Sequence, residues 1–167
     1  MHYLTYVLVP AKADDIAAAV DDALLPFRKV QHFTDEEVGA DEDHFVVVFT
    51  SCERCCRFDW YLIGGRSDGY ITGRPYPMES MFDMRPLDDA KIADNSVLVP
   101  QLIQRLEADP DLYPCAIATH DGQWQERERD WRDKLRNGQL LDAWTARVMT
   151  ILSQYPDCTA VAVDCHI

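Results

Sequence analysis

The sequence has 167 residues, of which 47% are hydrophobic, and a formal net charge of -13 at pH 7. This length can supply one hydrophobic core, so we expect a single domain spanning residues 1–167. The negative charge disfavours direct binding to nucleic acid, since phosphate backbones are bound by clustered lysine and arginine. It favours instead a protein partner with a basic surface.

The N-terminal segment and the hydrophobic runs bear on the cellular location. No run reaches the length of about 18 apolar residues that a membrane span needs. The first residues lack the basic flank and the long apolar region of a secretory signal. We therefore expect a cytoplasmic protein without membrane contact, in which the six cysteines are free thiols or metal ligands rather than disulfides.

The first third of the chain predicts a strand, a helix and an acidic loop. Residues 2–10 are rich in β-forming residues and end at Pro10. A helix follows, because apolar residues recur at helical spacing from Ile16 to Phe27. Residues 34–43, with the sequence TDEEVGADED, are predicted to form a solvated acidic loop.

The middle of the chain predicts two further strands, an irregular segment and a helix. The strands are HFVVVFTSC, residues 44–52, and RFDWYLI, residues 57–63. Residues 73–94 contain three prolines and no clear period, so they are expected to be irregular. Asn95 or Ser96 is expected to cap a helix with Pro100 in its first turn.

The last third predicts a hairpin, a helix and a final strand. Asp121-Gly122 lies between two β-like runs, which is typical of a hairpin. Apolar residues from Leu141 to Tyr155 follow one helix face, and residues 159–167 form the last strand. This order predicts an α+β fold with a mostly antiparallel sheet and about three helices packed on it, ferredoxin-like in broad layout.

The segment RFDWYLIGGRSDGY ends an apolar strand on two glycines and an arginine. Glycines 64 and 65 allow positive φ or the close approach of another group, so that Arg66 is redirected at the end of the sheet. Its guanidinium suits a carboxylate or phosphate, and strand alternation places Asp59 and Tyr61 on one wall of such a pocket. The alternative is a hairpin in which Arg66 pairs with an internal carboxylate.

The C-terminal strand sorts its residues into two faces. Asp164 and His166 share one face, where they can act as an orienting carboxylate and a general base. The alternative is that His166 is only a surface or pairing residue. Cys165 points to the other face and is predicted to be a small core residue.

The cysteine cluster SCERCC offers half of a zinc site. Cys52, Cys55 and Cys56 contain one C-x-x-C pair, which is typical of zinc ligands. A second half must come from cysteines or histidines elsewhere in the fold. The pattern therefore leaves the cofactor unknown and admits zinc on a partial motif, the alternative being that these cysteines are free thiols.

Four segments resemble an uncharacterised family of bacteriophage and bacterial hypothetical proteins. They are DWYLIGGRSDG, NSVLVPQLIQRL, CAIATHDGQWQER and the final YPDCTAVAVDCHI. The family pattern has DWYxIGGRW and a terminal VDCHI. Ser67 stands where the family has tryptophan, and Gln125 where it has histidine. The resemblance implies a phage or prophage setting and no particular mechanism.

Two function hypotheses follow, beside a third in which the chain is a structural α+β module whose aromatic and glycine motif serves folding only. The first is a small phage-associated accessory protein that binds a basic host protein, as an anti-defence inhibitor or an acidic mimic of nucleic acid. The second is a small-molecule, nucleotide or hydrolytic site. It would be formed where the IGGR turn meets the C-terminal strand, and its ligand-binding residues would be Asp59, Tyr61, Arg66, Asp164 and His166.

Overall fold

The computed structural model describes residues 2–28, 57–77, 85–127 and 139–167. Several features predicted from the sequence lie outside these residues. They are the acidic loop 34–43, the strand expected over residues 44–52, and the cluster of Cys52, Cys55 and Cys56.

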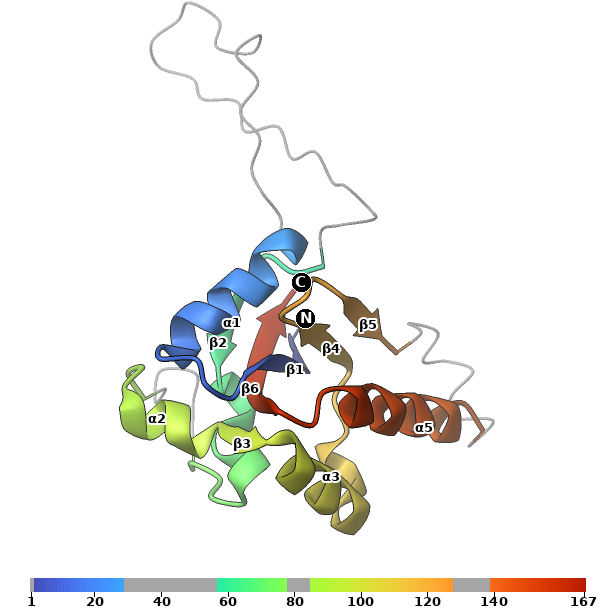
Figure 1. Ribbon diagram of the computed structural model, residues 1–167. Helices are drawn as coiled ribbons and strands as arrows, with labels where there is room; N and C mark the ends of the chain where they lie inside the picture. The colour runs from blue at the N-terminus through green and yellow to red at the C-terminus, as the bar shows by residue number, and fades with distance from the viewer. Residues whose placement is uncertain (1, 29–56, 78–84, 128–138) are drawn as a thin grey trace, which may run out of the picture.

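The two ends of the chain form the centre of the sheet. Strand β6 (Cys158–His166) pairs antiparallel with β1 (His2–Pro10) along the full length of both strands, from His2 opposite His166 to Pro10 opposite Cys158. Both strands are buried and rich in β-branched residues, which favours central positions. The termini therefore lie side by side (Figure 1).

Four shorter strands extend the sheet within the described residues. Strand β4 (Ala116–Thr119) runs parallel to β1, and β5 (Trp124–Glu126) pairs with β4 as a hairpin, which confirms the hairpin prediction. Strands β2 (Trp60–Ile63) and β3 (Ser96–Leu98) pair with β6. Because β1 occupies one edge of β6 completely, β2 and β3 share the other edge, end to end. The order is β2-β6-β1-β4-β5, with β3 beside β6.

Helices cover both faces of the sheet (Figure 1). On one face, α1 (Ile16–Leu24) buries Val20, Ala23 and Leu24 against valines of β1 and β6. On the other face, α3 (Val99–Ala108) and α5 (Gln139–Gln154) bury Leu102, Leu106, Trp144 and Val148 in a second core. Each helix presents its apolar stripe to the sheet, as the helical spacing of these residues predicts.

The α+β class is confirmed, and the finer layout needs correction. Among the described residues, four of the five strand pairings are antiparallel, while the parallel pair β1 and β4 makes the sheet mixed. The helices outnumber the expected three, since short 3₁₀ turns and α2 (Asp89–Asp94) accompany α1, α3 and α5. A ferredoxin-like layout is not confirmed.

Two local predictions were wrong. Residues 73–94 are not wholly irregular, because α2 forms within them; its N-cap Asp88 accepts a hydrogen bond from the backbone N–H of Lys91. The next helix begins at Val99 rather than directly after Asn95 or Ser96. The intervening residues form β3, whose pairing with β6 supplies backbone hydrogen bonds that a helix start there would forgo.

No α-helix in the described part of the chain has the length and apolar character that crossing a bilayer requires.

Candidate functional site

The double glycine turn allows two polar side chains to approach the backbone closely. Gly64 and Gly65 have φ values of 76° and 50°, which L side chains rarely adopt. A Cβ atom on Gly64 would lie 2.7 Å from the amide nitrogen of Asn95, and one on Gly65 would lie 2.3 Å from Cβ of Asp164. The turn therefore requires glycine for both conformation and space, and it places the IGGR segment against β6.

Asp164 connects this turn to the N-terminal strand. Its side chain is 5% exposed. The backbone N–H of Arg66 donates to Oδ2 at 3.1 Å, and Nδ1 of His2 lies 3.1 Å from Oδ1 and 3.2 Å from Oδ2. A carboxylate only accepts hydrogen bonds, so Nδ1 of His2 must carry the proton. In the neutral imidazole, Nε2 then keeps its lone pair, as in a general base.

Three aromatic rings cluster next to this carboxylate, and each contacts the other two; the His2 and Trp60 centroids are 5.3 Å apart. His2, His166 and Trp60 occupy matching positions on β1, β6 and β2. The Trp60 and His166 rings stack with centroids 4.9 Å apart, and the His2 and His166 centroids are 4.8 Å apart. The side chains of His2 and His166 are 11% and 31% exposed. This half-open end of the sheet, formed by His2, Asp59, Trp60, Asp164 and His166, is called the imidazole site below.

The surroundings of His166 favour its neutral form. Burial lowers the pKa of His166 and the neighbouring His2 lowers it further, while Asp59 and Asp164 partly oppose the change. Oδ2 of Asp59 lies 3.8 Å from Nδ1 of His166, too far for a hydrogen bond. Nδ1 is buried and has no hydrogen-bond partner within the described ranges. The site thus combines one carboxylate-oriented imidazole with a second, weakly basic one.

The structure brings together four of the five residues predicted to bind a ligand. Asp164 and His166 share a face as predicted, Asp59 approaches His166, and Arg66 contributes its backbone N–H. Tyr61 lies on the opposite face of β2, where its hydroxyl donates to Asp21 at 2.9 Å and burial raises its pKa. Asp59 and Tyr61 separate because β2 begins only at Trp60, so strand alternation does not extend to Asp59.

Sequence reasoning missed His2 and Trp60. His2 could have been found from the face on which it lies. His2 precedes Leu4 and Tyr6 on one face of the first strand, and Tyr6 is buried in the second core with Ala160 and Ala162. Pairing the two terminal strands antiparallel would have placed His2 beside His166.

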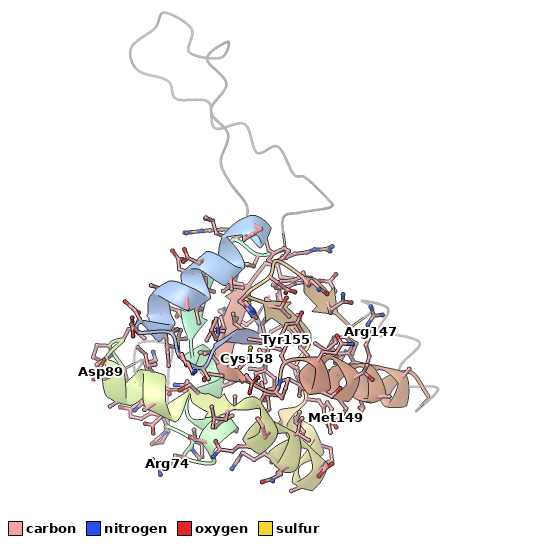
Figure 2. The ribbon with its side chains drawn as sticks, in the orientation of Figure 1. Arg74, Asp89, Arg147, Met149, Tyr155 and Cys158 are labelled. Carbon is pink, nitrogen blue, oxygen red and sulfur yellow. The ribbon has the colours of Figure 1, made fainter. Side chains whose placement is uncertain are left out.

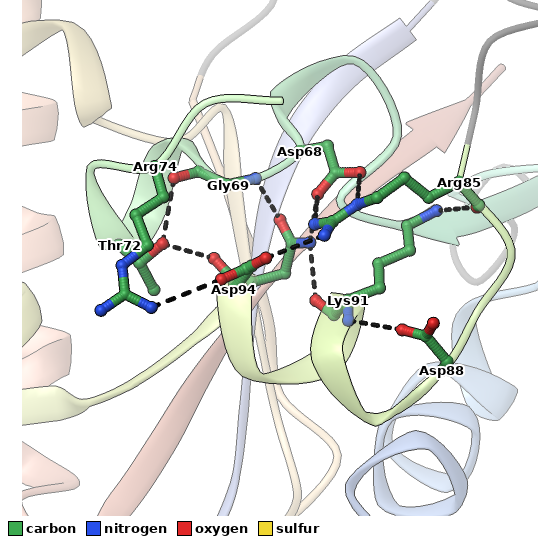
Figure 3. Close-up of polar contacts among 9 residues, drawn as sticks. Asp68, Gly69, Thr72, Arg74, Arg85, Asp88, Lys91 and Asp94 are labelled. Atoms are coloured by element: carbon green, nitrogen blue, oxygen red, sulfur yellow. Dashed lines mark hydrogen bonds and ion pairs between the residues drawn. The ribbon is translucent and has the colours of Figure 1, made fainter. Parts of the chain in front are cut away.

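A buried polar network holds the turn that follows the glycines (Figure 3). Asp68 is 2% exposed and accepts hydrogen bonds from Nε and Nη2 of Arg85 at 3.0 and 2.6 Å. Asn95 donates to Asp68 at 2.7 Å and accepts from the backbone N–H of Gly69 at 2.9 Å. Burial alone would raise the pKa of Asp68, but the bonds from Arg85 and Asn95 hold it below its ordinary value. The network fixes the loop that carries Arg66.

A cysteine and a histidine meet at the other end of β6. Sγ of Cys158 lies 3.9 Å from Nδ1 of His120, and Tyr155 covers the imidazole edge-on; Figure 2 shows Tyr155 and Cys158 together between α5 and β6. Burial raises the pKa of the Cys158 thiol, so the reactive thiolate is disfavoured. This pair is a poor candidate for nucleophilic catalysis.

The metal prediction falls mainly outside the described residues, where Cys52, Cys55 and Cys56 lie. Within the described ranges, no group of three or more His, Cys, Asp or Glu side chains is arranged to hold a metal ion. Cys115, Cys158 and Cys165 are free thiols. Burial raises the pKa of Cys165 to about 12, in keeping with its expected place in the core.

Comparison with protein-family models gave no match. Comparisons with curated proteins and with solved structures likewise gave none.

Proposed function

We propose that this chain binds a small molecule at the imidazole site and hydrolyses it by general acid–base chemistry. The observation that carries the proposal is the hydrogen bond between His2 and Asp164, at 3.1 Å. Such a pair is what a general base needs, because the carboxylate fixes both the tautomer and the direction of the ring. The surrounding turn adds a second hydrogen bond to the same carboxylate.

In the proposed mechanism, Nε2 of His2 removes a proton from a water molecule as the water oxygen attacks the carbonyl carbon of an ester. The C–O bond to the alcohol group then breaks, and the imidazolium of His2 gives its proton to the departing alcohol oxygen. The imidazolium that forms is stabilised by Asp164, to which Nδ1 remains bonded. The stacked rings of Trp60 and His166 offer an edge for an apolar or planar part of the substrate. Arg66 takes part through its backbone N–H, which donates to Asp164 at 3.1 Å and helps hold the carboxylate in place.

The test is the hydrolysis of p-nitrophenyl acetate and p-nitrophenyl phosphate by the full chain, with His2→Gln as the key variant. Loss of a general base typically costs about 100-fold or more in rate. His120→Gln is the matched control, because His120 is exposed and lies beside Cys158 at the other end of β6, outside the imidazole site. We expect His2→Gln to abolish most of the activity and His120→Gln to keep it. Equal rates for the two variants would contradict the proposal.

Binding of a basic host protein by a phage-associated protein remains a second proposal. The net charge of -13 favours this proposal. The acidic segment 34–43, which also suggested it, lies outside the described residues. Its test is the salt dependence of binding to any captured partner. Charge-driven association weakens as salt is added, so an affinity that is indifferent to ionic strength would argue against it.

A further inference from the structure

A pocket of about 400 Å³ lies at the outer edge of β2, and none of its lining residues belongs to the imidazole site. Three parts of the chain line it: Ala17 of α1, the strand residues Tyr61, Leu62 and Ile63, and a segment that contributes Arg85, Leu87 and Lys91. Its volume is in the range of small-molecule sites. Most of the lining side chains are apolar, and one amine lies among them.

That amine belongs to Lys91, which is unusually buried for a lysine. The residue is 4% exposed, and Nζ donates to the backbone oxygen of Arg85 at 2.9 Å. An ammonium group in such surroundings loses hydration, so burial lowers the pKa of Lys91; Arg85 lowers it further, and Asp68 and Asp88 oppose the change. Lys91 therefore holds more neutral amine at a given pH than a surface lysine does.

The charges beside the pocket are already paired, which bears on the kind of ligand it suits. The guanidinium of Arg85 bonds to Asp68 and also donates to Asp94 at 2.8 Å. These bonds leave Arg85 poorly placed to bind a further anion. The lining is better suited to a neutral, largely apolar molecule than to a phosphate or carboxylate.

The position of the amine is fixed by the fold. Asp88 caps α2 through the backbone N–H of Lys91, and Asn95 donates to the backbone oxygen of Lys91 at 2.9 Å. These contacts hold the first and last turns of the short helix, as Figure 3 shows. The side chain of Lys91 consequently starts from an anchored backbone, so little conformational freedom is lost when a ligand reacts.

We propose that Lys91 is a nucleophilic amine that forms a Schiff base with a small, apolar aldehyde or ketone bound in this pocket. The amine nitrogen attacks the carbonyl carbon to give a carbinolamine. Loss of the carbonyl oxygen as water then leaves a C=N bond to Nζ. No oxidant or reductant is needed, and the reaction is reversible by hydrolysis. This site is separate from the imidazole site and does not depend on the hydrolytic proposal.

The test is site-resolved trapping of the imine on the full chain. The protein is treated with butanal and sodium cyanoborohydride near neutral pH, digested, and analysed by mass spectrometry for alkylation at each lysine. Lys12 is exposed and serves as the internal reference. We expect Lys91 to be alkylated faster than Lys12, because the pocket holds the aldehyde beside an amine whose burial disfavours the charged form. Alkylation of Lys91 at or below the rate of Lys12 would overturn the proposal.

A pair of α1 variants separates pocket binding from general reactivity. Ala17 lines the pocket, whereas its neighbour Ala18 is exposed on α1. Ala17→Trp fills the pocket and should slow alkylation of Lys91 at least about tenfold, while Ala18→Trp should leave the rate unchanged. Equal rates in the two variants would show that the pocket does not bind the aldehyde, and the proposal would fail. Circular dichroism of both variants confirms that each is folded.

Discussion

His2 and Asp164 lie 162 positions apart in the sequence and share a hydrogen bond of 3.1 Å between Nδ1 and Oδ1. The bond exists because the first and last strands pair along their whole length at the centre of the sheet. It joins the N-terminus, the C-terminal strand and the double glycine turn in one polar site.

Substituting Gly65 by alanine should destabilise the protein strongly. The added Cβ would lie 2.3 Å from Cβ of Asp164 at a φ of 50°, so both strain and overlap oppose the change. We expect a loss of ~2–4 kcal/mol in the free energy of unfolding, measured by urea denaturation. Gly122→Ala is the control, because its φ is 83° but nothing lies within 4 Å of the added Cβ. That variant should lose only about 1 kcal/mol; equal losses would refute the close approach at Gly65.

Removing the hydroxyl of Tyr61 should leave the imidazole site unchanged. Tyr61 lies on the opposite face of β2 and bonds to the exposed Asp21 at 2.9 Å. Tyr61→Phe should cost about 0.5–1 kcal/mol of stability, the usual value of one hydrogen bond. The rate of p-nitrophenyl acetate hydrolysis should equal that of the wild type. A large drop in rate without unfolding would mean that Tyr61 takes part in the site.

The lowered pKa of His166 should make stability depend on pH below neutrality. The unfolded chain binds the proton near pH 6.5, whereas the folded chain binds it only at lower pH. The contribution of His166 is therefore present above pH 6.5 and is lost as the pH falls through the folded pKa. Urea denaturation at pH 7.5 and 5.5 should show that the free energy of unfolding falls more between these pH values in the wild type than in His166→Gln. Parallel pH profiles would contradict the burial of this imidazole.

Breaking the buried ion pair of Arg85 and Asp68 should lower the free energy of unfolding far more than breaking the exposed ion pair of Arg74 and Asp94. Arg85→Met leaves Asp68 buried without its main cation, which typically costs ~3–5 kcal/mol. Arg74→Met is the matched control, since Arg74 pairs with Asp94 across 3.7 Å with its side chain 79% exposed. That exposed pair should contribute less than about 1 kcal/mol.

The same network should also stabilise the protein against acid. Because Arg85 and Asn95 lower the pKa of Asp68, its contribution is present above the ordinary value of 3.8 and is lost as the pH falls through the folded pKa. Wild-type protein should therefore lose stability below pH 3.8 more steeply than Arg85→Met, in which the pKa of Asp68 is no longer held down.

The parts of the fold that the sequence predicted are those where local pattern and tertiary environment agree. The strands β1 and β6 and the helix α1 carry continuous apolar or periodic residues, and they form where expected. By contrast, α2 has the polar sequence DAKIAD and is held by Asp88 and by contacts of Asn95. Strand β3 is three residues long and exists through its pairing with β6. Such short elements depend on distant partners, which local propensity does not reveal.

The candidate site was predicted only in part, because some of its contacts follow from local pattern and others from distant partners. The alternation of β6 correctly paired Asp164 with His166, and the two glycines correctly indicated a close approach. His2 was missed because its role depends on which strand lies beside it. The sequence also did not predict that Arg66 binds Asp164 through its backbone N–H. This hydrogen bond depends on the path of the turn.

The most direct test of the proposed site is the tautomer of His2, read from long-range ¹H–¹⁵N correlation spectra of the folded protein above pH 7.5. Because Asp164 accepts from Nδ1, we predict that Nδ1 carries the proton and that Nε2 is unprotonated. Asp164→Asn should remove this preference. Observation of the Nε2-protonated tautomer in the wild type would contradict an imidazole oriented as a general base.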